Sequence, residues 1–302
     1  MTAASLRFWR IDSLPLVFRL NNRKLSDEKL SSPPDLLPTL YQTEQTHGWS
    51  SGMHAVTHAL LSSIALPPGP ILELGCGAGA FMAELAAHYP RRQVYGADIN
   101  PLALTHASRL LAQPPKLAGA DLQALPFADT TFSLVLALDA LDQKGVDPAL
   151  ALPESWRVLQ PQGLLLLRVS AHPWLEGMHD VAFNTGRRYA RHELVNALEA
   201  VGFTPIRTTY ANALLAPGIV PVRLLQRWGI LPFNEAYYTE PIANRLLALI
   251  LQAEAQWLQS HNFEFGVSLY VLALKNKHEV IFTEEQYNAN KSARLHRFAN
   301  LQ

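Results

Sequence analysis

The sequence predicts an α/β protein built on a Rossmann-like sheet. Short apolar runs alternate with stretches of helical periodicity from residue 71 to residue 210, which is the pattern of βαβ units and a parallel sheet. A glycine-rich turn follows the first apolar run, and an acidic residue ends the second. The 302 residues, 49% of them hydrophobic and 17% charged, can bury a large core and exclude a disordered chain.

Charge and cysteine usage exclude several classes of protein. The 25 Lys and Arg residues balance the 25 Asp and Glu residues, so the chain lacks a basic excess and we expect no nucleic-acid partner. Cys76 is the only cysteine, which excludes a disulfide framework within the chain and a cysteine-rich zinc site, and we expect no metal. The single cysteine and an N-terminus without an uninterrupted apolar core favour a cytoplasmic location.

Residues 70–81, Pro-Ile-Leu-Glu-Leu-Gly-Cys-Gly-Ala-Gly-Ala-Phe, predict a strand, a sharp glycine turn and the start of a helix. Glycines let the backbone approach a ligand closely, and a helix start offers N–H groups without intrahelical partners. Dinucleotide sites use G-x-G-x-x-G at this point, whereas this chain has G-x-G-x-G. Glu73 lies in the strand, where its carboxylate would repel a diphosphate but could hold an amine or a sulfonium.

The next motif places an acidic residue where a nucleoside could be held. Residues 93–98 predict a second strand that ends at Asp98, and its separation from Gly75 is close to the roughly 20 residues expected between a glycine turn and a ribose-binding acid. The alternative is that Asp98 only caps the helix that starts at Pro101. A third segment, residues 118–132, contains a further acid and an apolar Leu-Pro-Phe wall.

These three segments, in this order, resemble the motifs of class I S-adenosylmethionine (SAM)-dependent methyltransferases of the bacterial UbiE/type 11-like small-molecule group. The resemblance covers roughly residues 45–275 and implies a seven-stranded sheet flanked by helices, with strand seven antiparallel. It implies SAM as the cofactor, with Asp121 accepting from the adenine amine and Leu122 donating its backbone N–H. The cofactor contacts that it implies are Glu73, Gly75, Cys76, Gly77, Gly79, Asp98, Ile99, Asp121, Leu122 and Leu138.

The loop after strand five, at residues 172–189, is expected over the bound ligand at the carboxyl edge of the sheet. His179 is the candidate general base, since an unperturbed imidazole titrates near neutrality, and Asp180 beside it is a candidate substrate anchor. Alternatively, Arg187 or Arg188 pairs with Asp180 to hold the loop, and an acidic nucleophile needs no base. The candidate substrate contacts are Trp49, Trp174, Arg187 and Tyr189.

For two of these candidate substrate contacts, a purely structural role is the alternative, and at two other positions the chain differs from the family's motifs. Trp49 either closes the SAM pocket or packs the N-terminal arm on the core, and Tyr189 either contacts the acceptor or caps the next helix. Many relatives have a histidine where Gln143 stands, and several have one where Thr185 stands.

We divide the chain into an N-terminal arm of undefined structure (1–45), a SAM-dependent methyltransferase domain (46–276) and a polar C-terminal extension (277–302). Residues 210–265 are long for a connection between strands six and seven, and their periodicity predicts a helical lid insertion. We expect its apolar side chains to pack on the core. A less favoured alternative is that they line a pocket for an apolar acceptor, and the least favoured is that they rest on a membrane surface. No feature predicts the oligomeric state.

The sequence therefore predicts methyl transfer from SAM to a small organic acceptor, at an oxygen nucleophile, by in-line displacement. One alternative is a non-catalytic SAM-fold protein that binds or assembles with a partner. The other, with less support, is an NAD(P)-dependent oxidoreductase, which would leave Glu73 and the loop at Asp121 without a role.

Overall fold

The computed structural model describes residues 8–11, 14–18, 47–111, 116–228, 230–231 and 241–276. Its strands are β1 (Phe8–Ile11), β2 (Leu14–Phe18), β3 (Ile71–Leu74), β4 (Val94–Asp98), β5 (Lys116–Gly119), β6 (Phe132–Leu138), β7 (Leu159–Ser170), β8 (Phe203–Ala211) and β9 (Ser268–Lys275). Its helices are α2 (Gly48–Ser62), α3 (Ala80–His88), α4 (Pro101–Leu110), α5 (Pro148–Val158), η2 (Pro173–Leu175), α6 (Met178–Ala182), α7 (Arg191–Val201), α8 (Ala216–Arg227) and α9 (Pro241–Leu258).

The described strands form one sheet in the order β1-β2-β5-β4-β3-β6-β7-β9-β8. The strands from β5 to β7 run parallel, and β9 is antiparallel to both β7 and β8. The seven strands from β5 to β8 in this order confirm the predicted Rossmann-like sheet with an antiparallel last strand. In the N-terminal arm, β1 and β2 form an antiparallel hairpin, and β2 extends the sheet by pairing in parallel with β5.

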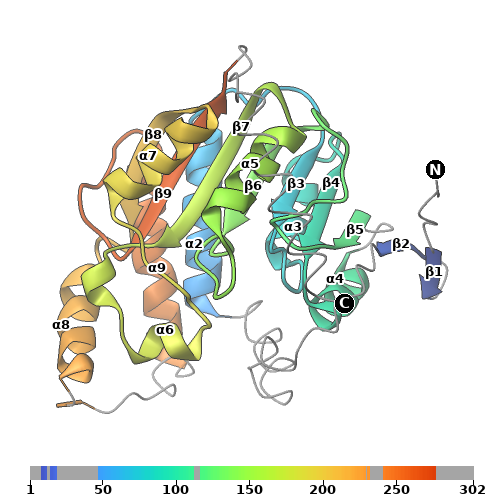
Figure 1. Cartoon of the computed structure of the whole chain (residues 1–302). Helices are drawn as coiled ribbons and strands as arrows, with labels where there is room; N and C mark the ends of the chain where they lie inside the picture. Colours follow the sequence, from blue (N-terminus) through green and yellow to red (C-terminus); the bar gives the residue numbers. More distant parts are fainter. Residues whose placement is uncertain are drawn as a thin grey trace, which may run out of the picture.

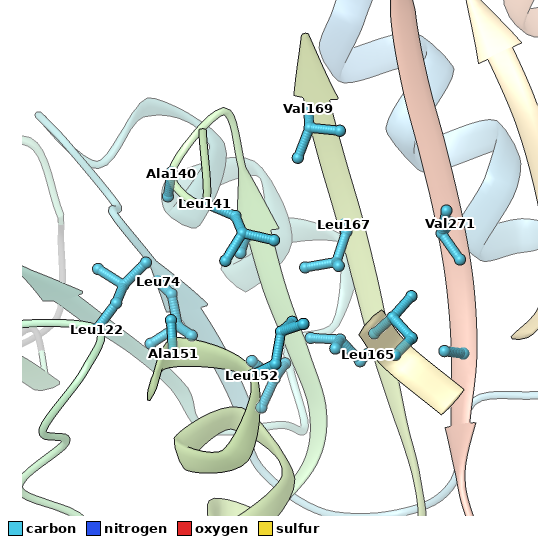
Figure 2. Packing of buried hydrophobic residues seen from close by; sticks show 14 of the residues in the cluster. Leu74, Leu122, Ala140, Leu141, Ala151, Leu152, Leu165, Leu167, Val169 and Val271 are labelled. Carbon is cyan, nitrogen blue, oxygen red and sulfur yellow. The ribbon is translucent and has the colours of Figure 1, made fainter. Parts of the chain in front are cut away.

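Helices cover both faces of the sheet (Figure 1). Alternate residues of β6 belong to opposite faces, because side chains of a strand point to its two sides in turn. Leu134 and Leu136 pack with apolar residues of α2, α3 and α9, whereas Val135 and Ala137 pack with α5 and α7. Figure 2 shows the second face, where Leu152 of α5 lies among side chains of β7 and β9. The apolar run at residues 132–138 is therefore a central strand, as its composition predicts.

The helix boundaries follow from local capping chemistry. α7 ends at Val201, because Gly202 follows it in the left-handed conformation at φ 101°. α2 begins at Gly48, because His47 Nδ1 accepts a hydrogen bond from the Trp49 N–H at 3.2 Å and so caps the helix.

Close packing of α2 on α9 brings the predicted lid insertion into the core. A Cβ at Gly52 would lie 2.5 Å from Cβ of Leu251, so only glycine permits this approach. The Gly48 N–H also donates to Asn244 Oδ1 at 2.6 Å. α8, from the same insertion, lies against η2 instead. A lid role for residues 210–265 stays a prediction, but α9 is a packed layer beside the sheet.

We predict that Gly52→Ala destabilises the protein by about 1–3 kcal/mol, because the added methyl group overpacks the contact with Leu251. This loss exceeds the gain of about 1 kcal/mol that alanine gives over glycine inside a helix. Urea unfolding measures the difference. Gly218→Ala in α8 is the matched control, since a Cβ there meets nothing within 4 Å. A Gly52→Ala protein as stable as the wild type would contradict this packing.

Candidate functional site

The glycine turn after β3 forms a tight corner against the neighbouring strands. Gly75, Gly77 and Gly79 all have positive φ, at 68°, 51° and 81°. The N–H groups of Gly75 and Cys76 both donate to the carbonyl of Ala97, at 2.7 and 3.1 Å, which fixes the corner to β4. A Cβ at Gly75 would lie 2.6 Å from Cβ of Ala140, so the loop after β6 also touches this corner.

The carboxylate of Asp98 joins the glycine corner to the start of α4. Its Oδ2 accepts from the Gly77 N–H at 2.9 Å, and its Oδ1 accepts from the Asn100 N–H at 2.8 Å. Asn100 caps α4 by accepting from the Leu102 N–H, so Asp98 is not the cap residue. Burial raises the pKa of Asp98, although the Asn100 and Gly77 N–H groups oppose that rise. Ile99 follows with 49% of its surface exposed at the same edge.

The third motif lies at the carboxyl end of β5, the strand next to β4 in the sheet. Asp121 follows β5, and its carboxylate accepts from the backbone N–H of Gln123 at 2.9 Å and from the Gln123 side-chain amide. Leu122 is buried in the core. The sheet thus brings Asp98 and Asp121 to the carboxyl ends of neighbouring strands, since Asp98 pairs with Gly119.

The remaining predicted cofactor contacts lie at or inside this edge. Glu73 is buried in β3, and the Cys76 side chain is buried in the core with Phe81 and Met82. Leu138 ends β6 and is half-buried against the same cluster. The backbone of Cys76 therefore faces the corner while its thiol packs inward.

A charged cluster lies at the ends of β6 and β7, and sequence reasoning interpreted its cation, Arg168, as scaffold. Arg168 is buried, and its Nη2 pairs with Asp139 Oδ2 at 2.7 Å. The guanidinium lies 5.4 Å from the Trp49 ring centroid, and its Nη1 is 3.4 Å from the Tyr270 hydroxyl. Burial lowers the pKa of Arg168, but Asp139 and Tyr270 more than offset this, so the pKa lies above its ordinary value. The only sequence signal for this cluster was a single cationic residue, Arg168, near the end of an apolar strand.

The loops after β6 and β7 are joined to each other. Asp142 is buried, and its Oδ2 accepts from the Ser170 N–H at 2.7 Å. Burial, together with the nearby Asp139, raises the pKa of Asp142 to about 6. Gln143 and Thr185, the two positions that depart from the family, face each other in an antiparallel bridge.

The candidate catalytic pair lies on α6. Asp180 is buried, and Arg188 donates to both of its carboxylate oxygens, at 2.6 and 3.0 Å, while the Gly177 N–H donates at 2.8 Å. These contacts match the alternative in which an arginine pairs with Asp180 to hold the loop. Burial lowers the pKa of His179 to about 3, and the charge of Arg223 adds to that effect. His179 is therefore a neutral and weakly basic imidazole, which does not favour a role as general base.

The candidate substrate contacts have different surroundings. Tyr189 is buried in the core, and its hydroxyl donates to the carbonyl of Leu141 at 3.3 Å, so it packs the loop. The Arg187 guanidinium lies 4.7 Å from the Tyr189 ring centroid, at the surface. Trp174 in η2 is 45% exposed, and Trp49 lies against Arg168. Only Trp49 is placed beside the carboxyl edge by a contact with the charged cluster.

The described residues were compared with the requirements of a metal site and of a membrane-spanning helix. Among them, no three His, Cys, Asp or Glu side chains are grouped as a metal site requires. The described helices include none that is both long and apolar enough to cross a membrane.

Comparisons with known proteins show that part of this chain is similar to methyltransferases. Residues 72–167 match the family model described as a methyltransferase domain. Malonyl-[acyl-carrier protein] O-methyltransferase from Legionella pneumophila is 40% identical over 79 residues, which cover 26% of this chain and 28% of that protein. The protein of the same name from Herminiimonas arsenicoxydans is 31% identical over 152 residues, which cover 47% and 55%. The chain thus spans 28% to 55% of the length of these two relatives.

A solved structure shows the same fold. Geranyl diphosphate C-methyltransferase from Streptomyces coelicolor, in complex with Mg²⁺, geranyl-S-thiolodiphosphate and S-adenosyl-L-homocysteine, matches with a TM-score of 0.50 and 15% sequence identity. The match covers 72% of this chain and 75% of that chain.

We predict that Asp142→Asn changes how stability depends on pH. An acid with a folded-state pKa of about 6, against an ordinary 3.8, makes the folded state bind more protons between these values. Wild-type stability therefore falls as pH rises from about 4 to 6, relative to the variant, by roughly 2–3 kcal/mol. Chemical unfolding at pH 4, 6 and 8 measures this. A wild-type minus variant difference that is constant with pH would contradict it.

Proposed function

We propose that this chain, whose residues 72–167 match a methyltransferase domain, is a class I SAM-dependent methyltransferase that transfers the SAM methyl group to an oxygen of a small organic acceptor. Bound SAM supplies an electrophilic methyl group on its sulfonium. The residues of the chain bind and orient the two molecules and exclude water, so that the acceptor oxygen displaces the thioether in line.

Asp98 is the observation that carries this proposal. Its Oδ2 accepts from the Gly77 N–H and its Oδ1 from the Asn100 N–H, which fixes the side chain beside the glycine corner. A carboxylate has about four lone-pair sites, so these backbone N–H groups leave it acceptor capacity for a ribose hydroxyl of an adenosyl group. The half-buried position of Asp98 leaves it accessible at this edge.

We propose a carboxylate as the acceptor group. The relatives named above act on the oxygen of a malonyl group, which carries a free carboxylate. A carboxylate is already anionic near neutral pH, so its methylation requires no base. This agrees with a pKa of about 3 for His179 and with an Asp180 carboxylate held by Arg188. Trp49, Trp174 and Arg187 remain candidate acceptor contacts.

The binding partners and the cellular location of the protein are also proposals. We propose a small-molecule acceptor with an apolar part, and no nucleic-acid partner, from the balanced charge of the chain. A cytoplasmic location stays a prediction from cysteine usage. The oxidoreductase alternative lacks support, because the matched family transfers methyl groups. The non-catalytic alternative predicts SAM binding without transfer of labelled methyl to any metabolite in a cell extract.

We predict that Asp98→Ala weakens SAM binding by about 1–3 kcal/mol, through lost hydrogen bonds to a charged acceptor and two backbone N–H groups left without partners. Isothermal titration calorimetry measures this. Asp129→Ala is the control, since that carboxylate is mostly exposed and pairs with Arg157. Wild-type affinity in the Asp98→Ala protein would overturn the assignment of Asp98 to the ribose.

We predict that His179→Ala leaves the rate of methyl transfer within about threefold of wild type between pH 6 and 8, because a weakly basic imidazole removes no proton at these pH values. The rate is measured with labelled SAM and the acceptor found by screening carboxylic acids. A large loss of rate, with a pH profile that changes with the substitution, would return His179 to the role of base.

A further inference from the structure

α8 is the part of the predicted insertion that the core covers least. Ala216 is its one buried residue, and Ile219 and Val220 are half-buried against Leu175 and Val267. α9, from the same insertion, packs on α2 instead. Figure 1 shows α8 and α6 at the lower end of the molecule, outside the layers of helix that cover the sheet. Packing on the core therefore does not account for the apolar composition of α8.

The outward side of α8 has no polar side chain. The exposed residues on that side are apolar or lack a side chain, and they are Pro217, Gly218, Pro221 and Val222. Arg227 lies on the other side of the helix, two turns after the half-buried Val220. A surface helix ordinarily turns its polar residues to water. The outward side of α8 therefore has the composition of a covered surface.

Further large apolar side chains are exposed next to α8. Trp228 and Ile230, directly after the helix, are 66% and 63% exposed. Burial lowers the pKa of His179 and the charge of Arg223 lowers it further, so α6 and α8 lie close together. Together with the outward side of α8, the exposed apolar residues of these elements form what we name the α8 surface, and they are Val181, Phe183, Leu214, Trp228, Ile230 and Leu231. Exposed apolar residues that are grouped in this way mark an interaction surface.

Both ends of α8 are tied to the rest of the protein. Glu254 of α9 is fully buried, and its carboxylate accepts from the backbone N–H groups of residues 212–214, at 2.6, 2.8 and 3.1 Å. At the other end, Arg227 Nη1 donates to the carbonyl of Trp174 at 2.7 Å. These four hydrogen bonds hold the helix with its apolar side outward, so the α8 surface is a fixed feature of the fold.

Charge and shape indicate what covers this surface. Arg223 and Arg227 are the charged residues between positions 212 and 231, a stretch without Asp or Glu. An anionic lipid surface attracts both, and the bilayer accepts protruding apolar side chains of any shape. Two copies of the chain in two-fold contact would instead bring equal positive charges together and would need self-complementary surfaces. Trp228 also fits the boundary of a bilayer, because an indole ring has an apolar body and a polar N–H.

We propose that the α8 surface docks on an anionic lipid bilayer, with its apolar side chains in the boundary layer and Arg223 and Arg227 at the level of the head groups. For α8 this selects the alternative that the sequence ranks last, whereas α9 packs on the core as the sequence predicts. The inference concerns a surface, and it depends neither on methyl transfer nor on the identity of the acceptor.

The first test is co-sedimentation of the full chain with vesicles of phosphatidylcholine and phosphatidylglycerol, which we expect the wild type to bind. Trp228→Ser combined with Ile230→Ser should lower the partition coefficient at least about tenfold, because two large apolar side chains no longer leave water. Trp257→Ser combined with Ile206→Ser is the matched control, since both residues are exposed outside the α8 surface. A wild-type protein that stays in solution, or equal losses in the two double variants, would overturn the inference.

The second test examines the charge. Arg227→Gln should weaken binding to the anionic vesicles by about fivefold, and Arg227→Lys should restore it, because each cation near an anionic surface contributes to binding. On vesicles of phosphatidylcholine alone, the wild type should bind more weakly and Arg227→Gln should make no difference. Wild-type binding that is equal on the two compositions would overturn the assignment to an anionic lipid.

Ultracentrifugation and calorimetry with SAM separate the remaining outcomes. A wild-type dimer that the Trp228→Ser and Ile230→Ser variant dissociates, without vesicle binding, would assign the α8 surface to a second copy and overturn the inference. Wild-type SAM affinity in this variant shows that it is folded, and Trp228→Ser alone provides the same comparison if it is not. A wild-type protein that binds vesicles but not SAM would support the inference and overturn the proposed function.

Discussion

The carboxylate of Asp98 is the contact on which the site depends, because it links two backbone segments that arise from different βα units. It accepts from Gly77 in the corner after β3 and from Asn100 at the start of α4. Without a short acidic side chain here, two N–H groups near the surface would lose their partner. The same side chain keeps lone pairs for a ligand, as the proposed contact of Asp98 with the ribose of SAM requires.

The far side of the site is formed by segments distant in sequence. β9 runs antiparallel between β7 and β8, and this places Tyr270 beside Arg168. α2 passes over the same edge and contributes Trp49 and Thr57. Close packing of α9 on α2 holds that helix in place through Gly52. The C-terminal half of the described chain therefore supports the edge of the sheet at the candidate site as well as the core.

Local signals predicted much of the fold and the first half of the site. The strand at 71–74, the glycine corner and the acid at position 98 are encoded within short segments, and Gly202 marks the end of α7. The Arg168 cluster could not be predicted, because ion pairs and ring contacts between β6, β7, β9 and α2 depend on strand order. For the same reason, sequence alone left open whether Arg187 or Arg188 holds Asp180, and the structure identifies Arg188.

The most direct measurement of the central claim is a crystal structure of the chain with sinefungin, a stable analogue of SAM. The account predicts ribose hydroxyls within about 3 Å of the Asp98 carboxylate, with the Gly77 and Asn100 hydrogen bonds retained. A crystal in which the adenosyl group lies away from Asp98, or in which protein side chains fill the corner, would contradict it.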